Sequence, residues 1–147
     1  MDIKATIEEK ISTLLRENQT IKNELEETVR KEEKNIDEIF CEFLTVIDTF
    51  ERAEQSIHEK GLISDDNVQK VMNRLLNAKK KALHVLEKYN IKKVEFEGNH
   101  LIPDLCEVTA TEPDSSRETD DIIEIEKQGY TRDGHLLRRA EVIIVRN

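Results

Sequence analysis

The closing stretch GYTRDGHLLRRAEVIIVRN, from Gly129 to Asn147, decides what kind of fold this chain can have. Asp133-Gly134 is a strong hairpin signal, because a type I′ turn needs positive φ at both central residues. The final EVIIVRN, residues 141–147, is a strongly apolar strand candidate. We therefore expect a β-hairpin followed by a terminal strand, although the earlier part of the chain contains almost no turn residues.

The chain before this stretch is helical in character, since its first glycine is Gly61 and its first proline is Pro103. A helix up to Gly61 would be about 85 Å long and must bury a stripe along its length. Apolar residues recur in alternating steps of four and three, which is a coiled-coil seam. The a positions are Ile11, Asn18 and Leu25, and the d positions are Ile7, Leu14 and Ile21.

Asn18 favours a parallel homodimer, because an asparagine at an a position meets its twin and fixes the register. The alternative is that Asn18 merely faces water. We expect the first dimer contacts at Ile11, Leu14, Asn18, Ile21 and Leu25.

The seam is weakest in EETVRKEEKN, residues 26–35, where Val29 is the only apolar residue. This segment is predicted to open first on heating. A second register, offset by one residue from the d positions of the first, then follows at Val29, Ile36, Phe43, Phe50 and Ile57. Such a discontinuity changes the local winding of a coiled coil.

A second, shorter helix is predicted from about Val68 to Tyr89, after the break GLISDDN at residues 61–67. Ser64 is a plausible N-cap, and Asn90 can end the helix. Two copies of this helix against two copies of residues 36–60 would form a four-helix bundle. The expected dimer contacts there are Phe43, Ile47, Phe50, Leu75 and Leu83.

The apolar period changes from 3.6 to 2 after Asn90, which indicates strands. The candidates are IKKVEF at 91–96, CEVTAT at 106–111 and IIEIE at 122–126. The fold class is therefore α+β: a long coiled-coil helix, a short helix that completes a dimeric four-helix bundle, and a small C-terminal β-domain. We place the helical stalk and dimerisation bundle at residues 1–90 and the β-rich binding domain at residues 91–147.

The composition excludes several functional classes. A net charge of −9 argues against nucleic acid and anionic membranes as partners. We see no signal peptide and no apolar run that would span a bilayer, and Cys41 and Cys106 read as small core residues, so we expect a cytoplasmic protein. The triplet Lys79–Lys81 is interpreted as a solvated face.

No catalytic or cofactor-binding motif is present. Carboxylate pairs such as Glu26-Glu27 and Glu32-Glu33 are expected on an exposed helix surface, where nothing would raise a pKa for acid–base catalysis. His100 and Cys106 flank Pro103, but two potential ligands are weak evidence for a metal site. We expect a binding protein without a cofactor, not an enzyme.

Three stretches resemble the GrpE family. FLTVIDTFERA at 43–53 is similar to the LLPVLDNLERA of that family, and LIPDLCEV at 101–108 is similar to its FDPNxHEAV element. Residues 129–145 resemble its carboxy-terminal GYxLNGRVLRPAxVxV. The order and spacing of the three stretches also match the family. The resemblance extends from about Thr20 to the end of the chain.

The resemblance implies a homodimeric nucleotide exchange factor for a DnaK-type chaperone. The β-domain would wedge open the nucleotide-binding domain of the chaperone, so that ADP leaves. It implies partner contacts at Leu101, Pro103, His135 and Ile144 in the β-domain, and at Lys22 and Arg30 on the long helix. It also implies temperature sensing by melting of the stalk.

The chain departs from the family pattern at several positions, which are Lys34, Cys106, His135 and Arg139, and only Lys22 remains of the usual arginine pair. The usual amino-terminal extension is expected to be nearly absent. The leading alternative function is a coiled-coil adaptor or scaffold with a β docking tip and no exchange activity. A holdase would need an exposed apolar groove, and the alternating charges give little sign of one.

Overall fold

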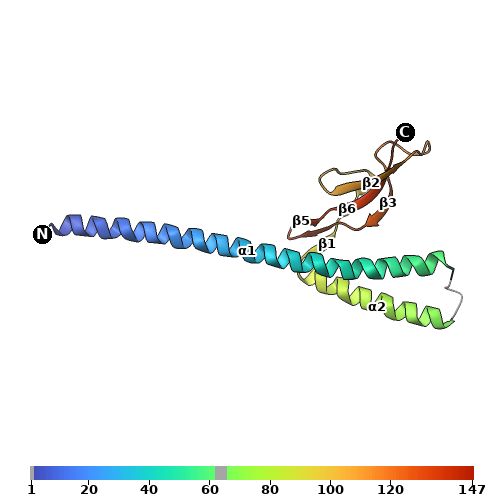
Figure 1. Cartoon of the computed structure of the whole chain (residues 1–147), viewed down its shortest axis with the longest axis horizontal. Helices are drawn as coiled ribbons and strands as arrows, with labels where there is room; N and C mark the ends of the chain where they lie inside the picture. Colours follow the sequence, from blue (N-terminus) through green and yellow to red (C-terminus); the bar gives the residue numbers. More distant parts are fainter. Residues whose placement is uncertain (1, 62–65) are drawn as a thin grey trace. The chain divides into compact units, whose positions relative to one another are not determined.

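Two helices and six strands follow one another in the computed structural model, which describes residues 2–61 and 66–147 (Figure 1). Helix α1 runs from Ile3 to Glu59 and α2 from Asp66 to Lys88. The strands are β1 (Ile91–Lys93), β2 (Cys106–Glu112), β3 (Ile122–Lys127), β4 (Tyr130–Arg132), β5 (His135–Arg138) and β6 (Ala140–Val145), and a 3₁₀ turn, η2, covers Glu97–Asn99. The expected α+β class is confirmed, with helices first and strands afterwards. Within the described ranges, no helix is long and apolar enough to cross a bilayer.

The chain forms two compact units, which divide α1 between Phe40 and Cys41. The N-terminal unit consists of α1 as far as Phe40. Its surface carries i,i+4 ion pairs such as Glu27–Lys31 at 2.9 Å, together with a series of exposed apolar side chains. The C-terminal unit, from Cys41 to Asn147, contains the rest of α1, α2 and both sheets.

The ends of the helices lie close to where the sequence predicts them. Gly61 follows α1 with a φ of 63°, the left-handed conformation that stops a helix. The predicted N-cap Ser64 lies outside the described residues. Asn90 ends α2 with a φ of 56°, and its side-chain amide donates to Asp133 Oδ1 at 2.9 Å, so the end of α2 is fastened to the β4–β5 turn.

The strands form two sheets of three strands each, in the orders β1-β4-β5 and β2-β6-β3. The predicted turn is confirmed, since Asp133 and Gly134 join β4 to β5 with φ values of 49° and 84°. Strand β6 is central in the second sheet, antiparallel to β3 and parallel to β2. The core of this sheet is formed by Cys106, Ile122, Ala140, Val142 and Ile144, with Phe96, Leu101 and Ile125 packed against it.

The β1-β4-β5 sheet is attached to the second half of α1. Leu44 and Ile47 are completely buried, and they share a face of α1 with Asp48 because residues three and four apart are neighbours on a helix. The Asp48 carboxylate accepts two hydrogen bonds of 2.8 Å from the Arg138 guanidinium on β5. Cys41 Sγ lies 3.4 Å from the carbonyl oxygen of Leu137, to which it donates.

The prediction that Ile47 contacts a second copy of the chain is therefore wrong. Its side chain has no exposed area left in the single chain, because it is part of the chain's own core. The sequence could not distinguish the two possibilities for Ile47. A contact with a second chain and a contact with the chain's own sheet both need a large apolar side chain at helical spacing.

Gly129 is required by a close approach between strands. A Cβ atom at this position would lie 2.8 Å from the backbone nitrogen of Ala140 and 3.2 Å from the Arg138 carbonyl oxygen. We expect Gly129→Ala to destabilise the protein by about 2 kcal/mol or more, because backbone atoms must shift to relieve the overlap. Urea unfolding followed by tyrosine fluorescence measures the loss. Gly98→Ala is the control: its Cβ would meet nothing, so only about 1 kcal/mol of positive-φ strain is expected.

The Asp48–Arg138 pair should also be a major stabilising contact. Both side chains are largely buried, at 12% and 14% exposure, and Arg138 also donates to the Gln128 carbonyl oxygen. We expect Arg138→Ala to cost about 3 kcal/mol, because it leaves the Asp48 carboxylate buried without its partner. Arg139→Ala removes the same charge from the neighbouring exposed position and should cost less than about 0.5 kcal/mol. Equal losses in the two variants, measured by urea unfolding, would contradict this assignment.

Candidate partner-binding surface

The loop before β2 presents an apolar surface on a fixed backbone. Pro103 is exposed, Ile102 is 39% exposed, and Leu101 is half-buried against the core of the β2-β6-β3 sheet. Leu101 N–H donates to the Asp120 carbonyl oxygen at 2.9 Å, and Leu105 N–H donates to the Ile102 carbonyl oxygen at 2.9 Å. The loop is thus held on both sides of Pro103, and a rigid loop loses little conformational entropy when it binds a partner.

A side-chain pair reinforces the start of this loop. His100 Nδ1 lies 3.1 Å from Asp121 Oδ1, and the two residues also form an isolated β-bridge. The hydrogen bond from His100, followed by that from the Glu118 backbone N–H, lowers the pKa of Asp121. The contact with His100 thus favours the ionised form of Asp121, which can accept both hydrogen bonds.

His135 lies at the other predicted contact position, as the first residue of β5 directly after the turn, and its side chain is exposed. Leu136 beside it is 37% exposed. The hairpin therefore offers a histidine and an apolar side chain together.

Ile144, the fourth residue predicted to contact the partner in the β-domain, does not lie on the surface. It is completely buried in the middle of β6, where it belongs to the core of the β2-β6-β3 sheet. The assignment of a partner contact to Ile144 is therefore wrong. Ile144 lies on the same face of β6 as Ala140 and Val142, which are also completely buried, whereas the neighbouring Ile143 is only half-buried.

Lys22 and Arg30 are exposed on the helix of the N-terminal unit. The apolar seam of that unit is exposed as well. The exposed fractions are 52% for Ile7, 51% for Ile11, 57% for Leu14, 61% for Ile21 and 62% for Leu25, and Asn18 is also exposed. A series of large apolar side chains in water is unfavourable, so this face has the character of an interface.

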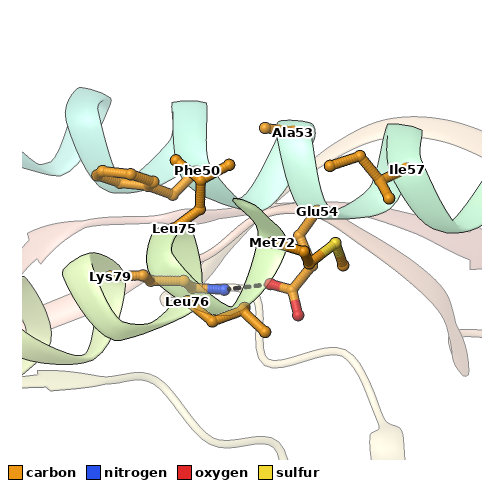
Figure 2. A pocket seen from close by; sticks show the side chains of 8 residues that line it. All are labelled: Phe50, Ala53, Glu54, Ile57, Met72, Leu75, Leu76 and Lys79. Carbon is orange, nitrogen blue, oxygen red and sulfur yellow. Dashed lines mark hydrogen bonds and ion pairs between the residues drawn. The ribbon is translucent and has the colours of Figure 1, made fainter. Parts of the chain in front are cut away.

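Helices α1 and α2 pack together through small and apolar side chains (Figure 2). Phe50, Ala53 and Ile57 of α1 line one hollow together with residues of α2, which are Met72, Leu75 and Leu76. Lys79 of α2 donates to Glu54 of α1 at 2.9 Å across the same contact. Of the predicted bundle contacts, Phe43, Phe50 and Leu83 are half-buried and Leu75 is 37% exposed, so each retains surface in the single chain.

The resemblance marks Glu51 and Arg138 as structural residues, but the sequence interpretation did not single out Leu44, Asp48 or Lys93, which also attach the β-domain to α1. Asp48 and Glu51 share a helix face with Leu44 at spacings of four and three, and they pair with basic residues of β5 and β1. The spacing could have been noticed, but it could not be distinguished from a solvated charged face. Their partners Lys93 and Arg138 lie more than 40 positions away in the chain.

Two buried titratable groups of the β-domain, Cys106 and Tyr130, are kept neutral. Burial raises the pKa of the Cys106 thiol. Burial, and then the negative charge of Glu51, raise the pKa of Tyr130 well above its ordinary value. Across residues 2–61 and 66–147, no group of three or more His, Cys, Asp or Glu side chains could hold a metal ion.

Comparison with known proteins gives a consistent result. The family model described as GrpE matches residues 2–146. A protein named Protein GrpE from Synechococcus sp. (strain CC9902) is 31% identical over 101 residues, which are 69% of this chain and 43% of the relative. Protein GrpE from Actinobacillus pleuropneumoniae serotype 5b (strain L20) is 28% identical over 129 residues, which are 87% of this chain and 64% of the relative. The chain thus spans less than two thirds of the length of these relatives. The match across almost all of its residues nevertheless shows that the chain belongs to the GrpE family.

Proposed function

We propose that this protein is a homodimeric co-chaperone that accelerates ADP release from a DnaK-type chaperone in the cytoplasm. Membership of the GrpE family over residues 2–146 is the observation that carries this proposal. The partner surface consists of Leu101 and Pro103 in the loop before β2 and His135 on the hairpin, with Lys22 and Arg30 contributing from α1. The protein acts by binding, without a cofactor and without catalytic groups of its own.

The mechanism is a linkage between two binding events. If the β-domain binds the nucleotide-binding domain of the chaperone better when its cleft is open, it shifts the population toward the open state. ADP prefers the closed cleft, so each ligand weakens the other by the same factor. No residue of the exchange factor needs to touch the nucleotide. What the β-domain needs is a rigid contact surface, and the hydrogen bonds around Leu101 and Leu105 support that requirement.

The homodimer is supported by the exposed seam of the N-terminal unit. A helix as long as α1 is stable in water only if an apolar stripe is buried along it. In the single chain, the apolar seam residues from Ile7 to Leu25 are more than half exposed, whereas Leu44 is completely buried. A second copy would cover the exposed seam, pair Asn18 with its twin, and bring residues 1–90 into the stalk and bundle that precede the binding domain at residues 91–147.

The exchange activity is tested by release of a fluorescent ADP analogue from a DnaK-type chaperone. We expect the protein to accelerate release, and the double variant Pro103→Ala with His135→Ala to reduce the acceleration about tenfold or more, because each side chain would supply a central contact. Pro113→Ala is a matched control, since Pro113 is the other proline of the chain and is also exposed.

Two outcomes would contradict this proposal in different ways. No acceleration by the wild-type protein, with a dimer seen by analytical ultracentrifugation, would leave a coiled-coil adaptor whose β-domain docks elsewhere. Acceleration that survives in the double variant would keep the exchange function but remove the proposed contact residues.

Heating should melt the N-terminal unit before the C-terminal unit. Residues 26–35 carry charged side chains where the seam needs apolar ones, so few contacts hold that segment. Glu33 stands four residues after Val29 and three before Ile36, so Glu33→Leu would extend the second register. We expect this variant to stabilise the N-terminal unit by about 1–2 kcal/mol per chain.

Circular dichroism at 222 nm, compared with fluorescence from Tyr89 and Tyr130, both in the C-terminal unit, would follow the two transitions separately. Lys31→Leu is the control because position 31 belongs to neither register. A single cooperative transition in both signals, or the same gain in both variants, would refute the predicted order of melting.

A further inference from the structure

Glu51 lies at the centre of an ion-pair network that joins α1 to two other elements. Its Oε1 atom accepts from Lys93 Nζ on β1 at 2.8 Å and lies 3.6 Å from Lys79 Nζ on α2. Lys79 also binds Glu54 Oε2 at 2.9 Å, so its position is fixed from a second side. One carboxylate thus contacts both the helical hairpin and the sheet.

Lys93 is well placed to control the contact surface. It pairs in register with Tyr130 of β4, and the Val94 N–H after it donates to the Gly129 carbonyl oxygen at 2.9 Å. From β1 the chain continues into the loop that carries Leu101 and Pro103, and from β4 it continues into the hairpin that carries His135. Both parts of the proposed partner surface therefore follow, along the chain, from the two strands that pair at Lys93 and Tyr130.

Ion pairs hold both edges of this sheet to α1. The strand order is β1-β4-β5, so Glu51 holds one edge through Lys93 and Asp48 holds the other through Arg138. The β5 edge has a second contact, because Cys41 Sγ donates to the Leu137 carbonyl oxygen. Contacts with α1 at the β5 edge alone would restrain rotation about that edge poorly, and the Glu51–Lys93 pair at the β1 edge adds that restraint.

We propose that Glu51 is a positioning residue, which fixes the orientation of the β-domain on the helices through Lys93 and so sets how far the bound chaperone cleft opens. The effect on cleft opening rests on the proposed exchange function. The orientation of the β-domain on the helices is a property of the protein alone and does not depend on that function.

The Glu51–Lys93 pair differs from the Asp48–Arg138 pair in its expected contribution to stability. The Lys93 and Glu51 side chains are 38% and 24% exposed, so their ion pair contributes little to the free energy of folding. Removing it should therefore change orientation without unfolding the domain. This makes Lys93 the better position for a test than Arg138.

The test compares Lys93→Gln with Lys92→Gln. Lys92 is the preceding residue on the same strand, is exposed, and makes no ion pair with a described residue, so its variant is a matched charge control. Residual dipolar couplings of backbone amides would give the orientation of β4 and β5 relative to α2. We expect Lys93→Gln and Glu51→Gln to reduce the β-strand couplings with the pattern of added motion, and Lys92→Gln to leave them unchanged.

The exchange assay gives the second readout. At saturating concentration of the factor, the maximal acceleration of ADP release should fall up to about fivefold in Glu51→Gln and Lys93→Gln, which is the range that a partly exposed ion pair can supply. The double variant should be no worse than either single variant, because the two residues act through one contact. The melting temperature of the β-domain should change little in all of them.

Unchanged couplings in Glu51→Gln and Lys93→Gln would overturn the positioning role, whatever the exchange activity. Changed couplings with unchanged maximal acceleration, in an assay where the wild-type protein is active, would overturn the link to cleft opening. An equal loss in Lys92→Gln would show a general effect of charge and would also overturn it. A wild-type protein without exchange activity would refute the proposed function and with it the link to cleft opening, while the couplings would still decide the orientation.

Discussion

The bidentate contact between Arg138 and Asp48 is the interaction on which the C-terminal unit depends. The β1-β4-β5 sheet has strands of three, three and four residues, which is too little to be stable alone. The sheet is stabilised by packing on α1. Leu44 and Ile47 of α1 are completely buried, and Asp48 fixes the position of the sheet along the helix through its ion pair with Arg138. The Arg138 guanidinium, whose central carbon is 5.5 Å from the centre of the Tyr130 ring, joins the polar and apolar parts of this contact.

The same contact explains which features of the fold could be predicted. Local signals were sufficient for the long helix, for the end of α2 at Asn90 and for the Asp133-Gly134 turn, because each depends on the backbone preferences of a few adjacent residues. The parallel pairing of β2 with β6 could not be predicted, since it joins residues more than 30 positions apart without a local signal. The burial of Ile144 could not be predicted either, because successive side chains of a strand lie on opposite faces and the sequence does not say which face is covered. Ile144 shares the buried face of β6 with Ala140 and Val142, and Cys106 and Ile122 of the edge strands are buried in the same core.

The apolar residues of α1 show why the partner contacts were harder to predict than the helix itself. Periodicity identified Ile7, Ile11 and Ile47 as members of apolar stripes, but it could not say what covers each stripe. In the structure, Ile47 is covered by its own chain, whereas Ile7 and Ile11 are about half exposed. The change occurs within one helix, and it coincides with the point where the sheet becomes available to pack on it. The partner of a stripe is therefore a tertiary property, even when the stripe itself can be read from the sequence.

A protein that acts by shape must keep its contact surface still while a larger partner pulls on it. The β-domain meets this requirement with short-range constraints: the loop at Pro103 is held by backbone hydrogen bonds on both sides, and the hairpin at His135 begins from a tight turn. Neither constraint would matter if the whole domain could rotate on the helices. The linkage between partner binding and ADP release is only as strong as the difference in binding energy between the open and closed clefts. A domain that yields by rotation would bind both states nearly equally and lose that difference. Attachment of the sheet to α1 at both edges is therefore as necessary to the proposed mechanism as the contact residues themselves.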